Sequence, residues 1–231
     1  MLHQLEKYLG PIRMVVFCPA KSEPAMITSS DVDKFKTHMD TNFFSALKFI
    51  LPISQKMATN KQKGGRIVIV GDPMATQSTV PGMAAYACSK HALEALAMQL
   101  RAELMPHNIK VHYFLPVMMQ TNFLFRQKQI YPLVTKENLK HRRTSEADYM
   151  AKKLLRGITM EEFMICGSFS ITFMTTLKAQ FRIAFNLCFA PIAIMLRMYE
   201  DMRVQDQMFA YRHHHLQAQE AAPRDKGRVR K

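Results

Sequence analysis

The sequence predicts an α/β fold built on a doubly wound parallel sheet. Three runs rich in apolar and β-branched residues, 13–17, 66–70 and 109–115, have the length and composition of buried strands. The segments between them, 31–58 and 83–105, carry apolar residues at helical spacing. Strands that alternate with helices in this way pair in parallel through right-handed crossovers, with helices on both faces of the sheet.

The first strand, RMVVF, ends before Pro19 and leads to the helix predicted at 31–58. Either Ser29 or Ser30 is the candidate N-cap for this helix, and Asp31 and Asp33 occupy its first turn, where the helix dipole favours negative charge. Pro52 lacks an amide hydrogen, so we expect it to bend or break the helix near its end.

The second strand, RIVIV, is followed by an irregular segment at 71–81 and by the helix predicted at 83–105. The third strand, IKVHYFL, ends at Pro116. Ligands of parallel sheets bind beyond the carboxyl ends of the strands. We therefore expect a binding site where the residues that follow the three strands meet.

The composition changes twice beyond the third strand. Residues 120–153 are polar and charged, which predicts a flap leading into a short helix from about residue 145. Two uncharged segments, 163–177 and 183–196, are each shorter than the ~20 residues that a membrane-crossing helix needs. They predict an apolar helical pair, which forms either a membrane-embedded hairpin or interfacial helix, or a buried pair in a soluble core or subunit interface.

These patterns divide the chain into an α/β domain with a flap at 1–157, the apolar helical pair at 158–203 and a basic tail at 204–231. The formal net charge is +14, and the residues from 212 onward carry six Lys and Arg against Glu220 and Asp225. From residue 212 onward no Phe, Tyr or Trp lies between the basic residues, so an anionic membrane surface is a better partner than nucleic acid. A solvated tail without a partner is the alternative.

The four cysteines are scattered and form no CxxC pair, which indicates a reducing compartment without a disulfide framework. Three histidines occur in a row at 213–215. They have no Cys or carboxylate partner at ligand spacing, so no metal site is expected. The first residues, MLHQLEKYLG, carry charges and lack the long apolar stretch of a signal peptide.

Tyr86 and Lys90 are the candidate catalytic pair. They stand four residues apart at the start of the helix predicted at 83–105, so their side chains project from the same face. An ammonium beside a phenol favours the phenolate, which is one way to tune a general acid. The same spacing also arises by chance in many helices, so the pair alone does not establish catalysis.

The segment 13–121 resembles the short-chain dehydrogenase/reductase family. The resemblance is carried by the strand RIVIV, the loop PGMAA, and the motif from Tyr86 to Lys90, YACSK, at the start of a helix. The next strand ends in Pro116, with Thr121 beyond it. The matches follow the family's order and spacing, and they imply a Rossmann-type sheet.

Two upstream motifs match as well. MDTNFF resembles the family's helix with an active-site asparagine, here Asn42, and VVFCPA, which ends at Ala20, lies where the family has an Asn-Asn-Ala-Gly turn. The resemblance implies reduction of a ketone by hydride from a nicotinamide. It assigns proton donation to Tyr86, ribose binding and lowering of the tyrosine pKa to Lys90, and a proton-relay water to Asn42. The cofactor contacts that it implies come from Tyr86, Lys90, Ala20, Pro116 and Thr121.

Within this family, the apolar segments and basic tail are similar to those of the 3-ketodihydrosphingosine reductases. This similarity implies NADPH as cofactor and a long-chain keto sphingoid base as substrate. It also implies a location at the cytosolic face of the endoplasmic reticulum membrane. The helices predicted at 31–58 and 83–105 would then pair two copies in a homodimer.

The chain departs from the family at the catalytic serine. That position falls on Pro73, with Asp72 before it, and neither residue brings a hydroxyl donor to a substrate carbonyl. Loss of one such donor typically lowers turnover by about a hundred- to a thousandfold. Thr76 and Ser78 are the candidate substitutes.

The family's glycine-rich turn, which holds the cofactor pyrophosphate, is a second departure. The sequence has no glycine between Gly10 and Gly64, so we expect the first strands of the sheet and the adenosine half of the cofactor site to be missing. Val117 also stands where the family usually has glycine. Two interpretations stay open: an N-terminally shortened ketoreductase sequence, or a non-catalytic descendant that acts as a membrane-associated interaction module.

Overall fold

The computed structural model describes residues 8, 10–59, 64–77, 79–180, 199, 202–203 and 206. The chain divides into two compact units, Met1–Gln180 and Phe181–Lys231. The described secondary structure considered below belongs to the first unit. The basic tail predicted at 204–231 lies almost entirely outside the described residues.

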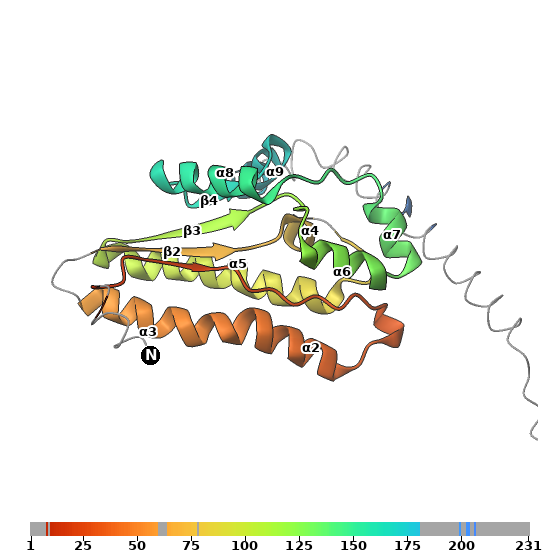
Figure 1. Cartoon of the computed structure of the whole chain (residues 1–231), viewed down its shortest axis with the longest axis horizontal. Helices are drawn as coiled ribbons and strands as arrows, with labels where there is room; N and C mark the ends of the chain where they lie inside the picture. The colour runs from red at the N-terminus through yellow and green to blue at the C-terminus, as the bar shows by residue number, and fades with distance from the viewer. Residues whose placement is uncertain are drawn as a thin grey trace, which may run out of the picture. The chain divides into compact units, whose positions relative to one another are not determined.

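Four strands form one parallel sheet in the order β1-β2-β3-β4 (Figure 1). Val16 of β1 stands opposite Val68 of β2, and Tyr113 of β3 stands opposite Met164 of β4. The predicted α/β class and its parallel sheet are confirmed. The strands are β1 Met14–Phe17, β2 Gly65–Val70, β3 Ile109–Leu115 and β4 Met164–Cys166.

Helices cover both faces of this sheet, with α2, α3 and α5 on one side and α8 and α9 on the other (Figure 1). A π-helical turn, η2, links α2 to α3. The helical elements are η1 Ile27–Ser29, α2 Val32–His38, η2 Met39–Phe44, α3 Ser45–Thr59, α4 Pro73–Gln77, α5 Ala84–Leu104, η3 Met105–His107, α6 Asn122–Ile130, α7 Leu133–Leu139, α8 Ala147–Thr159 and α9 Phe169–Gln180.

Successive residues of β2 supply both layers of the core, because side chains alternate between the two faces of a strand. Ile67 and Ile69 are fully buried and pack in a cluster with Leu93 of α5. Val68 is also fully buried and belongs to the opposite cluster, with Met150 of α8. Burial on both faces explains why the central strand reads as a continuous apolar run.

The prediction of an apolar helical pair at 158–203 needs correction. Met164–Cys166 is a strand, which pairs with β3 between Tyr113 and Leu115. Its backbone completes the edge of the sheet, and this pairing outweighs the helical tendency of an apolar run. Residues 169–180 form α9, whereas the second segment, 183–196, lies outside the described residues. No helix in the described part of the chain combines the length and the apolar character that crossing a bilayer requires.

Three other segments differ from the prediction in detail. Pro52 lies inside α3 without ending it, since Ile50 and Ile53 on either side anchor the helix in the core. The segment 71–81, predicted to be irregular, contains the short helix α4. The flap at 120–153 is largely helical, because α6 and α7 fold over the carboxyl ends of the strands (Figure 1).

Candidate active site

A pocket of about 320 Å³ lies beyond the carboxyl ends of β1, β2 and β3, where the sequence predicts a site. Its wall contains five of the six predicted site residues. These five are Ala20, Tyr86, Lys90, Pro116 and Thr121. Residues of the segment predicted as a flap, 120–153, line one side of the pocket. Among them Thr121 is the N-cap of α6, and its hydroxyl accepts a hydrogen bond from the Leu124 amide at 3.3 Å.

Tyr86 and Lys90 project from the first turns of α5 and are almost fully buried, at 5% and 2% exposed. The Lys90 ammonium lies 5.7 Å from the centre of the Tyr86 ring. It donates a hydrogen bond to the Val70 carbonyl at 3.0 Å, at the end of β2. The helix and the strand together therefore fix the ammonium beside the phenol.

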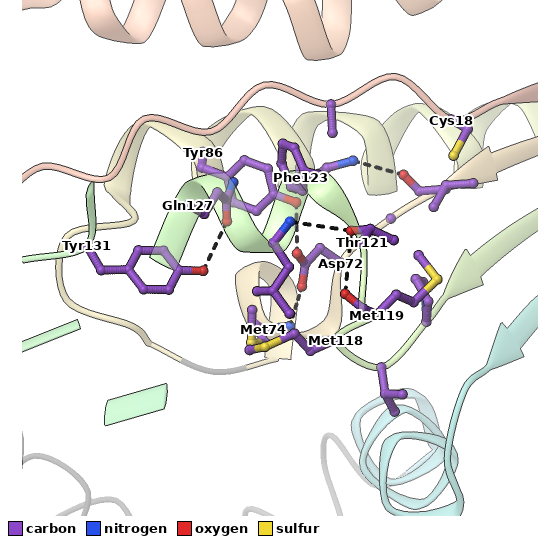
Figure 2. A pocket seen from close by; sticks show the side chains of 17 residues that line it. Cys18, Asp72, Met74, Tyr86, Met118, Met119, Thr121, Phe123, Gln127 and Tyr131 are labelled. Carbon is purple, nitrogen blue, oxygen red and sulfur yellow. Dashed lines mark hydrogen bonds between the residues drawn. The ribbon is translucent and has the colours of Figure 1, made fainter. Parts of the chain in front are cut away.

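Asp72 changes the chemistry of this pair. The Tyr86 hydroxyl donates to Asp72 Oδ2 at 2.8 Å, as Figure 2 shows, and Asp72 Oδ1 accepts from the Met74 amide at 2.8 Å. Burial, followed by the negative charge and hydrogen bond of Asp72, raises the pKa of Tyr86 well above its ordinary value. This direction is opposite to the lowering that the resemblance implies for Lys90.

The pKa of Lys90 is lowered, chiefly because burial disfavours the ammonium. The Asp72 carboxylate opposes this effect. Both members of the predicted pair are thus shifted toward their uncharged forms, and the surrounding protein is the main cause in each case.

Asn42, the sixth predicted residue, is fully buried but does not line the pocket. The side-chain oxygen Oδ1 of Asn42 accepts a hydrogen bond from the backbone amide of Lys21 at 2.6 Å, and its Nδ2 donates to the Lys21 carbonyl at 2.9 Å. It also donates to the Ser89 hydroxyl at 2.8 Å. These contacts tie the segment after β1 to the π-helical turn and to α5, next to Lys90.

Thr76, one of the two candidate substitutes for the missing serine, supplies no donor to the pocket. Pro73 is buried at the start of α4. The Thr76 hydroxyl donates to the Asp72 carbonyl at 3.0 Å, and the residue is not part of the pocket wall. Ser78 lies outside the described residues. Val117 does line the pocket, so its side chain takes up space there.

Sequence reasoning missed Gln127 and Tyr131, which line the far side of the pocket (Figure 2). The Tyr131 hydroxyl donates to Gln127 Oε1 at 3.0 Å, and the buried Gln127 Nε2 has no hydrogen-bond partner in the described part of the chain. Burial, with the charge of Asp72, raises the pKa of Tyr131 to about 12. The spacing of Leu124, Gln127 and Tyr131 along one helical face is the signal that could have found them.

The residues present fit the nicotinamide ribose of a cofactor. An ammonium has three donors, and Lys90 uses one on Val70, so two remain for a ribose diol. The same pocket wall that contains Lys90 also contains Ala20, Pro116 and Thr121. The described residues contain no glycine-rich turn of the kind that binds a pyrophosphate. His, Cys, Asp and Glu side chains of the described part do not gather into a group that could hold a metal ion.

Comparisons with known proteins identify the family of this chain. The family model of the short chain dehydrogenases matches residues 1–129. A 3-dehydrosphinganine reductase of Danio rerio is 29% identical over 164 residues, which are 71% of this chain and 48% of that protein. A 3-ketodihydrosphingosine reductase of Bos taurus is 27% identical over 164 residues, again 71% of this chain and 48% of that protein. The chain thus spans about half the length of these curated relatives.

Among solved structures, a short chain dehydrogenase from Burkholderia cenocepacia in complex with NADP superimposes with a TM-score of 0.61 at 18% identity. The match covers 80% of this chain and 72% of that one. At this identity the likeness shows the fold. Because the family model covers more than half of the sequence, the chain belongs to the short-chain dehydrogenase/reductase family.

Proposed function

We propose that this chain is an NADPH-dependent ketoreductase that acts on a long-chain keto sphingoid base. The observation that carries the proposal is the placement of Tyr86 and Lys90, both buried, in one pocket at the carboxyl ends of the strands. The sphingoid substrate and NADPH come from the resemblance and from the names of the relatives.

Tyr86 is the proton donor in this proposal. The phenol is protonated throughout the neutral range, as a general acid must be before it donates, and its raised pKa makes it a weaker acid than an ordinary tyrosine. The Lys90 ammonium holds the ribose and places its positive charge beside the phenol. A bound reduced nicotinamide would supply hydride to the carbonyl carbon, and Tyr86 would give its proton to the carbonyl oxygen.

The other walls of the pocket suit an aliphatic chain. Met118, Met119, Phe123 and Leu124 contribute apolar side chains between Pro116 and the middle of α6. Met is unbranched and adapts its shape to its contacts, so this wall can accept a flexible hydrocarbon. An aliphatic ligand would gain roughly 0.8 kcal/mol for each methylene that it buries there.

The direct test is product formation. The chain is incubated with a long-chain keto sphingoid base and NADPH, and both products are measured by mass spectrometry. The proposal predicts the amino alcohol and oxidised cofactor in equal amounts. Absence of both products, with no NADPH binding, would instead favour the non-catalytic descendant.

We also propose that the protein resides at the cytosolic face of the endoplasmic reticulum membrane, through the uncharged segments and the basic tail. Attachment through the apolar segments predicts pelleting with membranes that resists high salt. Release by salt would mean that the basic residues alone make the contact, because salt shortens the range of charge interactions from about 10 Å at 0.1 M to about 3 Å at 1 M.

Homodimer formation through α3 and α5 is the remaining part of the proposal. Phe49, Leu51 and Met98 on these helices are 44%, 44% and 47% exposed, which leaves apolar surface for a second copy. Sedimentation of the chain and of a Phe49→Glu, Met98→Glu variant tests it. A dimer is expected for the chain and a monomer for the variant.

A further inference from the structure

The Asp72 carboxylate is a charged group in a pocket whose walls are mostly apolar. It accepts hydrogen bonds from the Met74 amide and the Tyr86 hydroxyl, each at 2.8 Å. Lys90 also lines the pocket but donates to Val70, and these described residues show no ion pair between Lys90 and Asp72. The carboxylate therefore has no cation in direct contact, although Lys90 is close enough to act on it through space.

Reduction of a ketone changes the partners of Asp72. When Tyr86 donates to a carbonyl oxygen, Asp72 Oδ2 loses the hydroxyl that it binds in this structure. A partly buried carboxylate without its donor is unfavourable, and the penalty is larger for a charged group than for a neutral one. A simple ketone offers no group that could replace the lost donor.

A ketone with an ammonium on the neighbouring carbon does offer one. The carbonyl oxygen and the nitrogen of such a molecule are about one hydrogen-bond length apart, and so are Tyr86 Oη and Asp72 Oδ2. The two ligand atoms can therefore meet the two side chains side by side, and the charges of the ammonium and of Asp72 are complementary.

We propose that Asp72 is a specificity-determining residue that selects α-amino ketones, with the ammonium donating to Asp72 Oδ2 while Tyr86 donates to the carbonyl oxygen. The inference rests on the proposed function, since it places the reacting carbonyl at Tyr86. The bound ammonium also neutralises the negative charge next to Tyr86. The substrate itself thus makes the phenol a better proton donor.

The test compares the binding of three ligands to the full chain by calorimetry. The probes are a straight-chain α-amino ketone, its N-acetyl derivative and the same ketone without nitrogen. The amino ketone is expected to bind about ten- to a hundredfold more tightly than either neutral probe, the range expected for a hydrogen bond to a charged group. Equal binding of the three probes, or no binding of any, would overturn the inference.

Two variants separate charge from structure. Asp72→Asn keeps an oxygen acceptor for the Met74 amide and loses the charge, so it should bind all three probes about equally. Asp148→Asn removes an exposed carboxylate on α8 that pairs with Lys152, and it should keep the full preference of the unmodified chain. A preference that survives in Asp72→Asn would contradict the role of the carboxylate.

Reduction of the same probes with NADPH distinguishes the two proposals. If the probes bind in the expected order and none is reduced, the ketoreductase proposal fails and the ligand selection by Asp72 stands. If all three are reduced with the same kcat/KM, the ketoreductase proposal stands and the selection by Asp72 fails.

Discussion

At the scale of single residues, the environment of Tyr86 decides whether Tyr86 and Lys90, four residues apart, can transfer a proton. The sequence predicts both residues and their shared helical face. It also shows Asp72 before the position of the family's serine. The contact between Asp72 and Tyr86 could not be predicted, because it depends on the start of α4 folding against α5, with Asp72 Oδ1 bonded to the Met74 amide.

The first residue-scale prediction concerns the pKa of Tyr86. Asp72→Asn removes a negative charge and a charged acceptor from the phenol, so the pKa of Tyr86 should fall, while burial keeps it above the ordinary value of about 10. NMR titration of tyrosines labelled at Cζ measures this, with Tyr86→Phe to assign the resonance. An unchanged midpoint in Asp72→Asn would show that Asp72 does not influence the phenol.

A second prediction at this scale concerns Asn42. Replacement by Ala leaves the Lys21 amide and carbonyl without their partners and removes the donor to Ser89. The contact with Ser89 is buried and the two contacts with Lys21 are partly buried, so the free energy of unfolding should fall by about 1–3 kcal/mol. Urea unfolding measures the change. Asn122→Ala, at an exposed position, is the matched control and should stay within about 0.5 kcal/mol of the unmodified chain.

At the scale of elements, the long periodic segments and the three apolar runs are predictable, and β4 is not. Strand β4 is three residues long and lies within an uncharged run that also fits a buried helix. Its conformation depends on the free edge of β3, which is distant in sequence. The π-helical turn at Met39–Phe44 could not be predicted either, because the helical spacing of apolar residues continues through it.

The contact between α8 and β4 gives an element-scale prediction. A Cβ on Gly157 of α8 would lie 2.6 Å from Cγ1 and 2.7 Å from Cγ2 of Ile165. Gly157→Ala should therefore destabilise the fold by about 1–3 kcal/mol through overpacking, against a gain of up to about 1 kcal/mol in helix propensity.

A double-mutant cycle with Ile165→Ala provides the control for this prediction. The smaller side chain makes room for the added methyl group, so the double variant should be more stable than the sum of the two single effects implies. Thermal unfolding of the four proteins gives the coupling. Strict additivity would mean that Gly157 and Ile165 do not limit each other.

At the scale of the whole molecule, the fold could be predicted for residues 13–121 because family motifs occur there in order, and the matched family model covers much the same region. The catalytic competence of the site could not be predicted from the same motifs. It depends on the distances that separate Tyr86 and Lys90, which both lie on α5, from Asp72, which directly precedes α4.

Stability at alkaline pH is a whole-molecule prediction. Burial raises the pKa values of Tyr86, Tyr113 and Tyr131 in the folded state, with Asp72 contributing to each. In the unfolded chain these phenols ionise near pH 10, so the folded state binds more protons above that pH. The free energy of unfolding should be unaffected by these groups below about pH 10 and should fall as the pH rises further.

The variant Tyr113→Phe tests whether the free energy of unfolding falls as the pH rises above about 10. The Tyr113 hydroxyl is buried without a hydrogen-bond partner among the described residues, so its removal should have little cost at neutral pH. The variant should lose less stability than the unmodified chain between about pH 10 and pH 12, the range just above the ordinary tyrosine pKa. Identical slopes of stability against pH would show that Tyr113 ionises equally well in both states.

The central claim is that Tyr86 donates a proton to a ketone in this pocket. The most direct measurement is the rate of NADPH oxidation by the chain with a long-chain keto sphingoid base, compared with Tyr86→Phe and with Tyr131→Phe as a buried tyrosine in the same pocket. We predict measurable turnover for the chain, a loss of about a hundredfold or more in Tyr86→Phe, and a much smaller change in Tyr131→Phe. Turnover that is equal in the chain and in Tyr86→Phe would contradict the account.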